Sequence, residues 1–161
     1  LQRVAAGTHE TAYLAVLDDD EVVYIARNGP NRNMNTGYVL GARVPAQVTA
    51  AGMLMLSMRS DAELEHWLDN RALTVFTSHT ITCPAEMRRE LALIRTQDWA
   101  LCEQQLNLDS RGIAVPLRDR HGALAGALNI TMPMGRETGK DAVARVLPML
   151  RETAQAMRDL I

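Results

Sequence analysis

The segment 50–58 (AAGMLMLSM) is small and apolar on nearly every side, and this pattern limits the fold more than any other in the chain. Thr49, directly before it, is of a residue type that caps helix N-termini, so the pattern predicts a helix. A helix without a polar face has no side to turn toward water and must be covered all round. The rest of the 161 residues must therefore supply packing elements on several sides of this helix.

Strand patterns occur before and after this helix in the sequence. Residues 11–17 (TAYLAVL) and 22–26 (VVYIA) flank an acidic triplet, which predicts a β-hairpin with a solvated turn. A weaker third strand is predicted over 34–40. Three more strands are predicted after the helix, over 99–104, 113–117 and 124–131, the last two joined by a polar loop.

Three further segments have helical spacing of apolar residues. Residues 61–68 predict a short amphipathic helix, and Pro84 at a first helical position opens a helix that extends to about Gln97. Residues 140–161 predict a long amphipathic helix with a kink or break at Pro148. The threonine-rich stretch 74–82 has no helical stripe and is predicted to be a loop.

The order of elements is strands, helices, strands and a final helix, with no repeat at a fixed period. This order favours an α+β fold, in which helices cover an antiparallel central sheet, over a parallel array of alternating strands and helices. At this length one domain is expected, extending over residues 1–161.

Composition excludes several classes of function. With 17 Lys and Arg against 19 Asp and Glu, the net charge is −2, which supplies no basic field for a phosphate backbone. Only Cys83 and Cys102 occur, with no CxxC motif and no signal peptide, which favours a cytoplasmic protein. The apolar stretches are too short to span a bilayer, so no membrane partner is expected. The chain begins Leu1-Gln2-Arg3 without an initiator Met, which predicts a fragment of a longer protein.

Motifs for catalysis are missing from the sequence. It contains no HExxH, GxSxG, GxGxxG or P-loop, and its four histidines are scattered, which favours surface or structural roles for them. Cys83 and Cys102 would form a redox pair only if folding brought them together, and two inert thiols are the simpler interpretation. No catalytic residue, no metal site and no cofactor is therefore predicted.

Two patterns suggest a site for a small molecule. In the first, a loop leads through Pro45 and Thr49 into a helix whose first turn carries Ala50 and Ala51. The free N–H groups of such a turn and the positive end of the helix dipole favour a carboxylate. Small residues there could equally serve close packing against a sheet.

The second pattern is the strand predicted over 124–131. Asn129 and Thr131 lie on the same face as several alanines, which leave space beside them. Buried Asn and Thr need hydrogen-bond partners, and either a ligand or a neighbouring backbone group would serve. Arg111 adds a candidate clamp for a carboxylate, although an arginine at a strand start is often simply solvated.

Two motifs, taken in this order, resemble those of a known family. The first is Gly41-x-Arg43-x-Pro45-x-x-x-Thr49-Ala50-x-Gly52, and the second is Ser110-Arg111-Gly112-Ile113-Ala114-Val115-Pro116-Leu117, followed by Ala127-Leu128-Asn129-Ile130. With the pattern over 99–108, they resemble the effector-binding domain of IclR-type bacterial transcriptional regulators. The resemblance covers nearly the whole chain and is strongest to the branch that regulates aromatic-acid catabolism, the PcaR, PcaU and PobR regulators.

The resemblance implies a GAF-like fold with helices on both faces of the sheet and a pocket on one side of it. It implies an effector that is a small organic acid, such as protocatechuate or 4-hydroxybenzoate, held by the backbone amides of Ala50 and Ala51. It further implies contacts from Asn129 and Thr131, with Cys102 and Gly112 near the pocket wall. Such regulators form dimers or tetramers and bind DNA through an N-terminal winged helix-turn-helix domain, which this chain lacks.

Two other functions remain open at this point. GAF-like domains include thiol enzymes that reduce free methionine sulfoxide, which would need a reactive and a resolving cysteine in one pocket. A ligand-free dimerisation module is the third interpretation, and it predicts no pocket large enough for a ligand.

Overall fold

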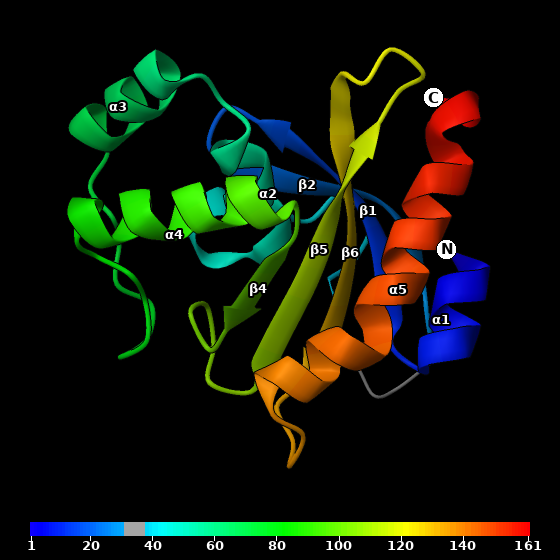
Figure 1. Ribbon diagram of the computed structural model, residues 1–161. Helices are drawn as coiled ribbons and strands as arrows, with labels where there is room; N and C mark the ends of the chain where they lie inside the picture. The colour runs from blue at the N-terminus through cyan, green and yellow to red at the C-terminus, as the bar shows by residue number, and fades with distance from the viewer. Residues whose placement is uncertain (31–37) are drawn as a thin grey trace.

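The computed structural model describes residues 1–30 and 38–161, which form a six-stranded sheet with helices on both faces (Figure 1). The strand order is β3-β2-β1-β6-β5-β4, and every neighbouring pair is antiparallel. The strands are β1 (Thr11–Asp18), β2 (Glu21–Asn28), β3 (Arg43–Pro45), β4 (Ala100–Glu103), β5 (Ser110–Arg118) and β6 (Leu124–Pro133). The helices are α1 (Gln2–Thr8), α2 (Ala50–Ser57), α3 (Asp61–Asn70), α4 (Pro84–Gln97) and α5 (Gly139–Met157), with short 3₁₀ turns η1 (Ala46–Val48) and η2 (Arg158–Leu160). The predicted α+β class and antiparallel sheet are confirmed.

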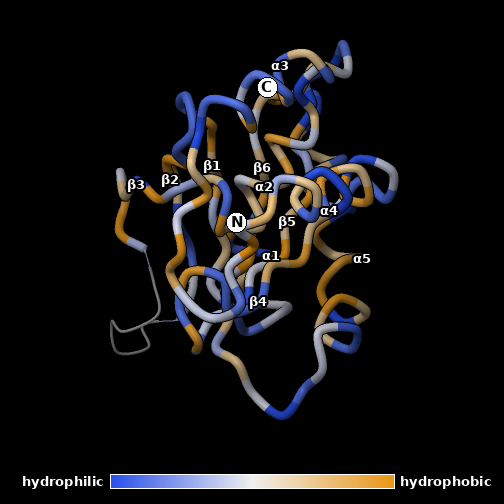
Figure 2. Tube along the Cα trace, turned by 90° about the vertical axis from the view of Figure 1, so that its left-hand side faces the viewer, coloured by the Kyte–Doolittle hydropathy of each residue, from blue (hydrophilic) through white to orange (hydrophobic). Residues whose placement is uncertain are grey.

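The sheet separates two hydrophobic cores. Helices α2, α3 and α4 pack on one face, and α1 and α5 pack on the other (Figure 1). Side chains along β6 alternate between the two cores, since Ala127 belongs to the first while Leu128 and Ile130 belong to the second. Figure 2 shows the same pattern along the chain, with hydrophobic residues recurring in the strands and hydrophilic residues at the turns.

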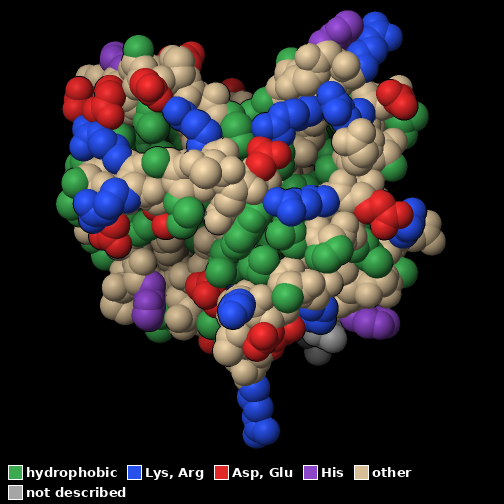
Figure 3. Space-filling model, viewed as in Figure 1, with side chains coloured by type: hydrophobic (Ala, Val, Ile, Leu, Met, Phe, Trp, Pro, Cys, Tyr) green, Lys and Arg blue, Asp and Glu red, His purple; other side chains and the backbone are tan. Residues whose placement is uncertain are grey.

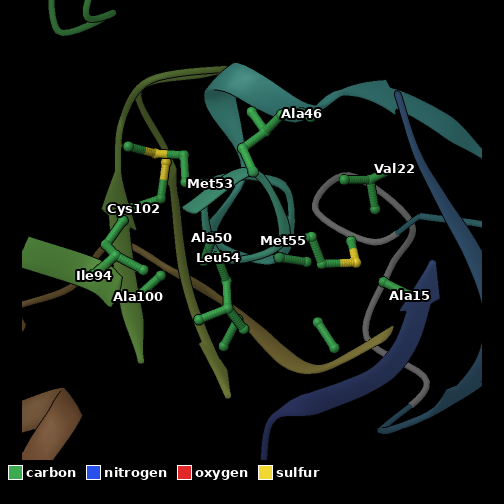
Figure 4. Packing of buried hydrophobic residues seen from close by; sticks show 14 of the residues in the cluster. Ala15, Val22, Ala46, Ala50, Met53, Leu54, Met55, Ile94, Ala100 and Cys102 are labelled. Atoms are coloured by element: carbon green, nitrogen blue, oxygen red, sulfur yellow. The ribbon is translucent and has the colours of Figure 1, made fainter. Parts of the chain in front are cut away.

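Helix α2 lies in the interior, as its sequence predicts. All eight of its residues are buried, and its side chains point outward in several directions into the core (Figure 4). At its N-terminus the Thr49 hydroxyl accepts a 3.0 Å hydrogen bond from the Gly52 amide. At its C-terminus the Arg95 guanidinium donates to the carbonyl oxygens of Ser57 (2.5 Å) and Arg59 (2.7 Å). Side chains thus bond to the backbone at both ends of a helix that water does not reach.

Most predicted elements are confirmed, with boundaries that differ by a few residues. The first hairpin, the helices from Asp61 and Pro84, the threonine-rich loop and the last three strands all form. The third strand is placed differently. Residues 34–37 of the predicted strand lie outside the described residues, Tyr38–Leu40 are not in a strand, and β3 pairs with β2 further along the chain. Arg43 in β3 forms ion pairs with Asp18 (2.7 Å) and Glu21 (2.8 Å), contacts that the hydrophobic pattern does not reveal.

Two helical features depart from the sequence prediction. The break considered at Pro148 is wrong, since α5 continues through it, and the helix bends along its length (Figure 1). Burial of Val146, Leu150 and Ala154 against the sheet offsets the backbone hydrogen bond that a proline removes. The short helix α1 was not predicted at all, and it packs against α5, where the Met149 side chain fills the space beside Gly7.

The close packing of α2 on η1 predicts a specific effect of substitution. A Cβ added at Gly52 would overlap the backbone of Ala46, so Gly52→Ala should lower the free energy of unfolding by about 1–3 kcal/mol. Gly135→Ala is the matched control, because nothing lies within 4 Å of its added Cβ. Urea unfolding of both variants measures the difference. Equal stability of the two variants would contradict the packing described here.

Candidate functional site

A pocket lies on the α2 face of the sheet, where the N-terminus of α2 meets β2, β4, β5 and β6. Its free interior is about 20 Å³, room for about one water molecule, and the volume reaches about 300 Å³ only when the open mouth and the gaps between atoms are counted. It is lined by Tyr24, Tyr38, Val48, Thr49, Ala50, Cys102, Gln104, Gln105, Leu106, Ser110, Arg111, Gly112, Asn129 and Thr131. Of the described residues, Arg111 is the one charged side chain in this lining.

The start of α2 supplies backbone donors to the pocket. Within residues 1–30 and 38–161, the amides of Ala50 and Ala51 have no hydrogen-bond acceptor, as expected for the first turn of a helix. Gly112 lets strand β5 lie close to this turn. A Cβ there would lie 3.2 Å from the Ala50 Cβ and 3.7 Å from both the Ala50 nitrogen and Asn129 Oδ1. The helix start and the Asn129 amide therefore both lie beside Gly112, in the lining of one pocket.

Asn129 and Thr131 form a polar pair on the pocket side of β6. Asn129 Nδ2 donates a 3.1 Å hydrogen bond to Thr131 Oγ1, and both residues are buried. This bond leaves the Thr131 hydroxyl proton and Asn129 Oδ1 for other partners. The pair can therefore donate one hydrogen bond to a polar guest and accept another from it.

Arg111 lines the pocket, but a protein carboxylate already neutralises it. Its Nη2 lies 2.7 Å from Glu103 Oε2 and also donates to the Glu137 carbonyl oxygen at 3.0 Å. The Arg111 side chain is only 3% exposed, whereas that of Glu103 is 32% exposed, so only the arginine is shielded from water. A buried charge held in this way is costly to separate from its partner. The arrangement favours a structural role over the free carboxylate clamp that the sequence suggested.

The tyrosines are the functional candidates that sequence reasoning missed. Tyr24 and Tyr38 stack with ring centroids 4.6 Å apart and planes 11° apart, and Tyr13 packs against Tyr24 with centroids 4.9 Å apart. The Tyr13 hydroxyl also accepts a hydrogen bond from the Tyr38 amide at 3.1 Å. All three tyrosines of the chain thus form one aromatic cluster, and two of them line the pocket. The alternation of the first hairpin could have placed Tyr13 and Tyr24 on the inner face, but their meeting with Tyr38 depends on the tertiary fold.

Burial changes the acidity of several pocket groups. It raises the pKa of Tyr24 well above its usual range and that of Tyr38 to about 12, with neighbouring phenols adding to the effect. Burial likewise raises the pKa of the Cys102 thiol to about 12, and Cys102 Sγ donates to the Val48 carbonyl oxygen at 3.3 Å. These groups are therefore uncharged at neutral pH. A protonated, buried thiol is a poor nucleophile.

A loop from the threonine-rich stretch holds the outer wall of the pocket in place. The hydroxyl of Thr77 donates to the Gln104 carbonyl oxygen at 2.5 Å, and that of Thr80 donates to the Gln105 carbonyl oxygen at 2.7 Å. The Gln105 side-chain carbonyl accepts from the Ile81 amide at 3.2 Å. Gln104 and Gln105 are thus positioned by residues some 25 positions earlier in the chain, which no local pattern reveals.

The fold brings most of the predicted site residues to one place. Seven of them line the pocket, namely Thr49, Ala50, Cys102, Arg111, Gly112, Asn129 and Thr131. The Ala51 side chain instead lies in the hydrophobic core, so only its backbone amide can take part. Whether these residues bind a ligand stays a prediction.

Other kinds of site find no support in the described part of the chain. Residues 1–30 and 38–161 contain no group of three His, Cys, Asp or Glu side chains that could hold a metal ion. No helix among them is long and apolar enough to cross a membrane. Cys83 is exposed and Cys102 is buried, and both are free thiols.

Comparison with known proteins identifies the family. Residues 1–158 match the family described as bacterial transcriptional regulator IclR, C-terminal, and the chain belongs to it. It is 34% identical to the Pca regulon regulatory protein of Pseudomonas putida, over 99% of this chain and 54% of that protein. It is 31% identical to the p-hydroxybenzoate hydroxylase transcriptional activator of Acinetobacter baylyi, over 100% of this chain and 61% of that protein. The chain thus spans little more than half the length of these relatives, which are regulators and not enzymes.

Solved structures of the family share the fold. The inducer-binding domain of the PobR transcription factor from Acinetobacter, a double mutant in complex with 3-hydroxybenzoic acid, superposes with a TM-score of 0.94 at 32% identity, over 100% of this chain and 94% of that one. The Thermotoga maritima IclR superposes with a TM-score of 0.88 at 26% identity, over 97% of this chain and 63% of that one. The GAF-like fold that the sequence resemblance implied, with helices on both faces of the sheet, is confirmed.

The raised pKa values predict a loss of stability at alkaline pH. Because the folded state holds the protons of Cys102, Tyr24 and Tyr38 more tightly than the unfolded state, their contribution is complete below about pH 9 and is lost as the pH rises toward 12. Urea unfolding measured from pH 8 to pH 11 should show this decline. Cys102→Ala should make the decline shallower, since Tyr24 and Tyr38 remain, whereas Cys83→Ala, which removes an exposed thiol, should leave it unchanged. A flat profile in the wild-type protein would contradict the prediction.

Proposed function

We propose that this chain, residues 1–161, is an effector-sensing domain that binds a small aromatic acid in the pocket at the start of α2. The observation that carries the proposal is that the unbonded backbone donors of α2 and the polar pair Asn129 and Thr131 belong to the lining of one pocket. A helix N-terminus stabilises an anion by up to about 2 kcal/mol through its free amides and its dipole. Among the described residues, no carboxylate lines the pocket to repel such an anion.

The pocket has suitable surfaces for each part of a hydroxybenzoate. The carboxylate would accept hydrogen bonds from the Ala50 and Ala51 amides, and the ring would pack beside the stacked pair Tyr24 and Tyr38. A ring hydroxyl would both donate and accept, which matches what Asn129 and Thr131 offer. The names of two relatives support this class, since one activator serves p-hydroxybenzoate hydroxylase and one solved domain holds 3-hydroxybenzoic acid. Protocatechuate and 4-hydroxybenzoate are therefore the first effectors to test.

The two other functions considered fit the site less well. A thiol reductase needs a reactive thiolate, whereas the Cys102 thiol is buried with its pKa raised to about 12 and Cys83 does not line the pocket. A ligand-free dimerisation module predicts no pocket large enough for a ligand, which fits the small free interior, but it leaves the unused bonding capacity of the buried Asn129 and Thr131 unexplained. The family comparison also places the chain among regulators.

The proposal extends to the full-length protein. Because the chain covers 54% of the Pseudomonas putida relative, the remainder has room for the winged helix-turn-helix domain that the resemblance implies. We infer that effector binding here is coupled to DNA binding there, and that the domain assembles as a homodimer or tetramer. The net charge of −2 on this chain supports placing DNA contact outside it.

The binding proposal is tested by removing one hydrogen bond from the pocket. Calorimetric titration with 4-hydroxybenzoate, 3-hydroxybenzoate and protocatechuate should show saturable binding to the wild-type chain. Thr131→Val keeps the shape of the side chain and should weaken binding by about 0.5–1.5 kcal/mol. Thr82→Val, an exposed position outside the pocket, is the matched control and should bind as the wild type does. Absence of binding for all three acids would contradict an aromatic effector.

A second variant tests the position of the acid group. Gly112→Ala places a methyl group between the α2 amides and Asn129, so it should reduce affinity at least about tenfold, or 1.4 kcal/mol. Its Cβ would meet the Ala50 Cβ at 3.2 Å, a tight contact that a small shift relieves, so the fold should persist. Gly135→Ala is again the control, and thermal unfolding verifies that both variants fold. Unchanged affinity in Gly112→Ala would place the ligand elsewhere.

A further inference from the structure

A second pocket, separate from the candidate effector site, lies between β5, the C-terminal end of α4 and the C-terminal part of α5. Its volume is about 710 Å³ including its open mouth. Three arginines line it, Arg118 from β5 and Arg151 and Arg158 from the end of the chain, together with one acid, Asp98. Figure 3 shows Lys and Arg side chains gathered above and below a hollow near the middle of this face.

Only one of these three positive charges has a carboxylate partner. Arg118 Nη2 lies 2.9 Å from Asp98 Oδ1. Arg151 Nη2 donates to the Gln97 carbonyl oxygen at 3.1 Å, and Arg158 Nε donates to the Asp119 carbonyl oxygen at 3.4 Å. Neither Arg151 nor Arg158 lies within 4 Å of an Asp or Glu oxygen in residues 1–30 and 38–161. The lining therefore holds two positive charges in excess.

Two nearby acids, Glu152 and Asp119, have partners outside the pocket. Glu152, which follows Arg151, forms an ion pair with Arg3 at 2.6 Å. The Asp119 carboxylate accepts hydrogen bonds from the amides of His121 (2.8 Å) and Ala123 (2.9 Å) in the hairpin turn. Each guanidinium uses only part of its five N–H donors in the bonds described above. Both charge and hydrogen-bonding capacity thus remain available to a guest.

The pocket lies beside an open part of the sheet edge. Strand β4 pairs with β5 only from Arg111 to Ala114, so among the described residues the stretch 115–118 has a partner strand, β6, on one side alone. Pro116 in this stretch has no N–H to donate, which disfavours the addition of another strand. Val115, Pro116 and Ala154 instead give the pocket an apolar surface beneath the arginines.

We propose that this second pocket binds a small dianionic phosphate compound, either inorganic phosphate or a phosphate monoester. A phosphate group near pH 7 carries a charge of about −1.5 to −2, which matches the excess of two positive charges. Guanidinium groups bind phosphate oxygens through paired N–H donors. The apolar surface formed by Val115, Pro116 and Ala154 would accept the organic part of an ester. A monocarboxylate would leave one charge uncompensated.

The test compares two double variants that change the net charge equally. Arg151→Gln with Arg158→Gln removes the two unpaired charges of the pocket. Arg89→Gln with Arg136→Gln removes two exposed arginines that line neither pocket. Calorimetry with inorganic phosphate and with methyl phosphate is performed at constant ionic strength, with chloride as the balancing anion. Thermal unfolding without phosphate verifies that both variants fold.

The proposal predicts saturable one-to-one binding to the wild-type chain and to the Arg89/Arg136 variant. In the Arg151/Arg158 variant the affinity should be at least tenfold weaker. Tighter binding of methyl phosphate than of inorganic phosphate would identify a monoester as the ligand, and the reverse would identify the free ion. Non-saturable binding, or equal loss in both variants, would mean an adventitious ion only and would overturn the proposal. Hydroxybenzoate titration of the same variants should be unchanged, so failure here is distinct from failure of the effector site.

Discussion

Complete burial of helix α2 is the constraint on which the rest of the structure depends. A helix with no polar face must be enclosed, and here the sheet, η1 and α4 enclose it. Its terminal backbone groups then need partners inside the protein, which Thr49 supplies at one end and Arg95 at the other. The first-turn amides of Ala50 and Ala51 remain unbonded within the described residues, and the candidate effector pocket lies directly beside them. The enclosure of the helix and the position of the pocket are therefore parts of a single arrangement.

Features of the fold that depend on local pattern could be predicted from the sequence. Apolar spacing located the helices from Asp61 and Pro84, and alternation located the first hairpin and the strand that carries Asn129. Features that depend on contacts between residues far apart in the sequence could not be predicted. The third strand was placed too early because β3 is held by ion pairs from Arg43 to the first hairpin. Pro148 suggested a break because a sequence window does not register how much apolar area α5 buries on the sheet.

The same distinction applies to the candidate site. Thr49, Ala50, Asn129 and Thr131 were found because a helix start and a strand face are local patterns, and the fold brings them to one pocket. The walls were missed, since Tyr24, Tyr38 and Gln105 reach the pocket only through long-range packing and through hydrogen bonds from the threonine-rich loop. For Arg111, the sequence identified the residue but could not show that Glu103 already neutralises it. An ion pair of this kind depends on the tertiary fold and not on a local sequence pattern.

The donors at the start of α2 belong to the main chain, and this has a consequence for how such a domain can evolve. A point mutation can delete a side chain but cannot delete a peptide N–H, except by introducing proline. If the acid group is bound by these amides, as proposed, this anchor survives substitutions at the surrounding walls, such as Tyr38, Gln104 or Thr131. A lineage that binds its effectors in this way can exchange one acid for another by altering those walls.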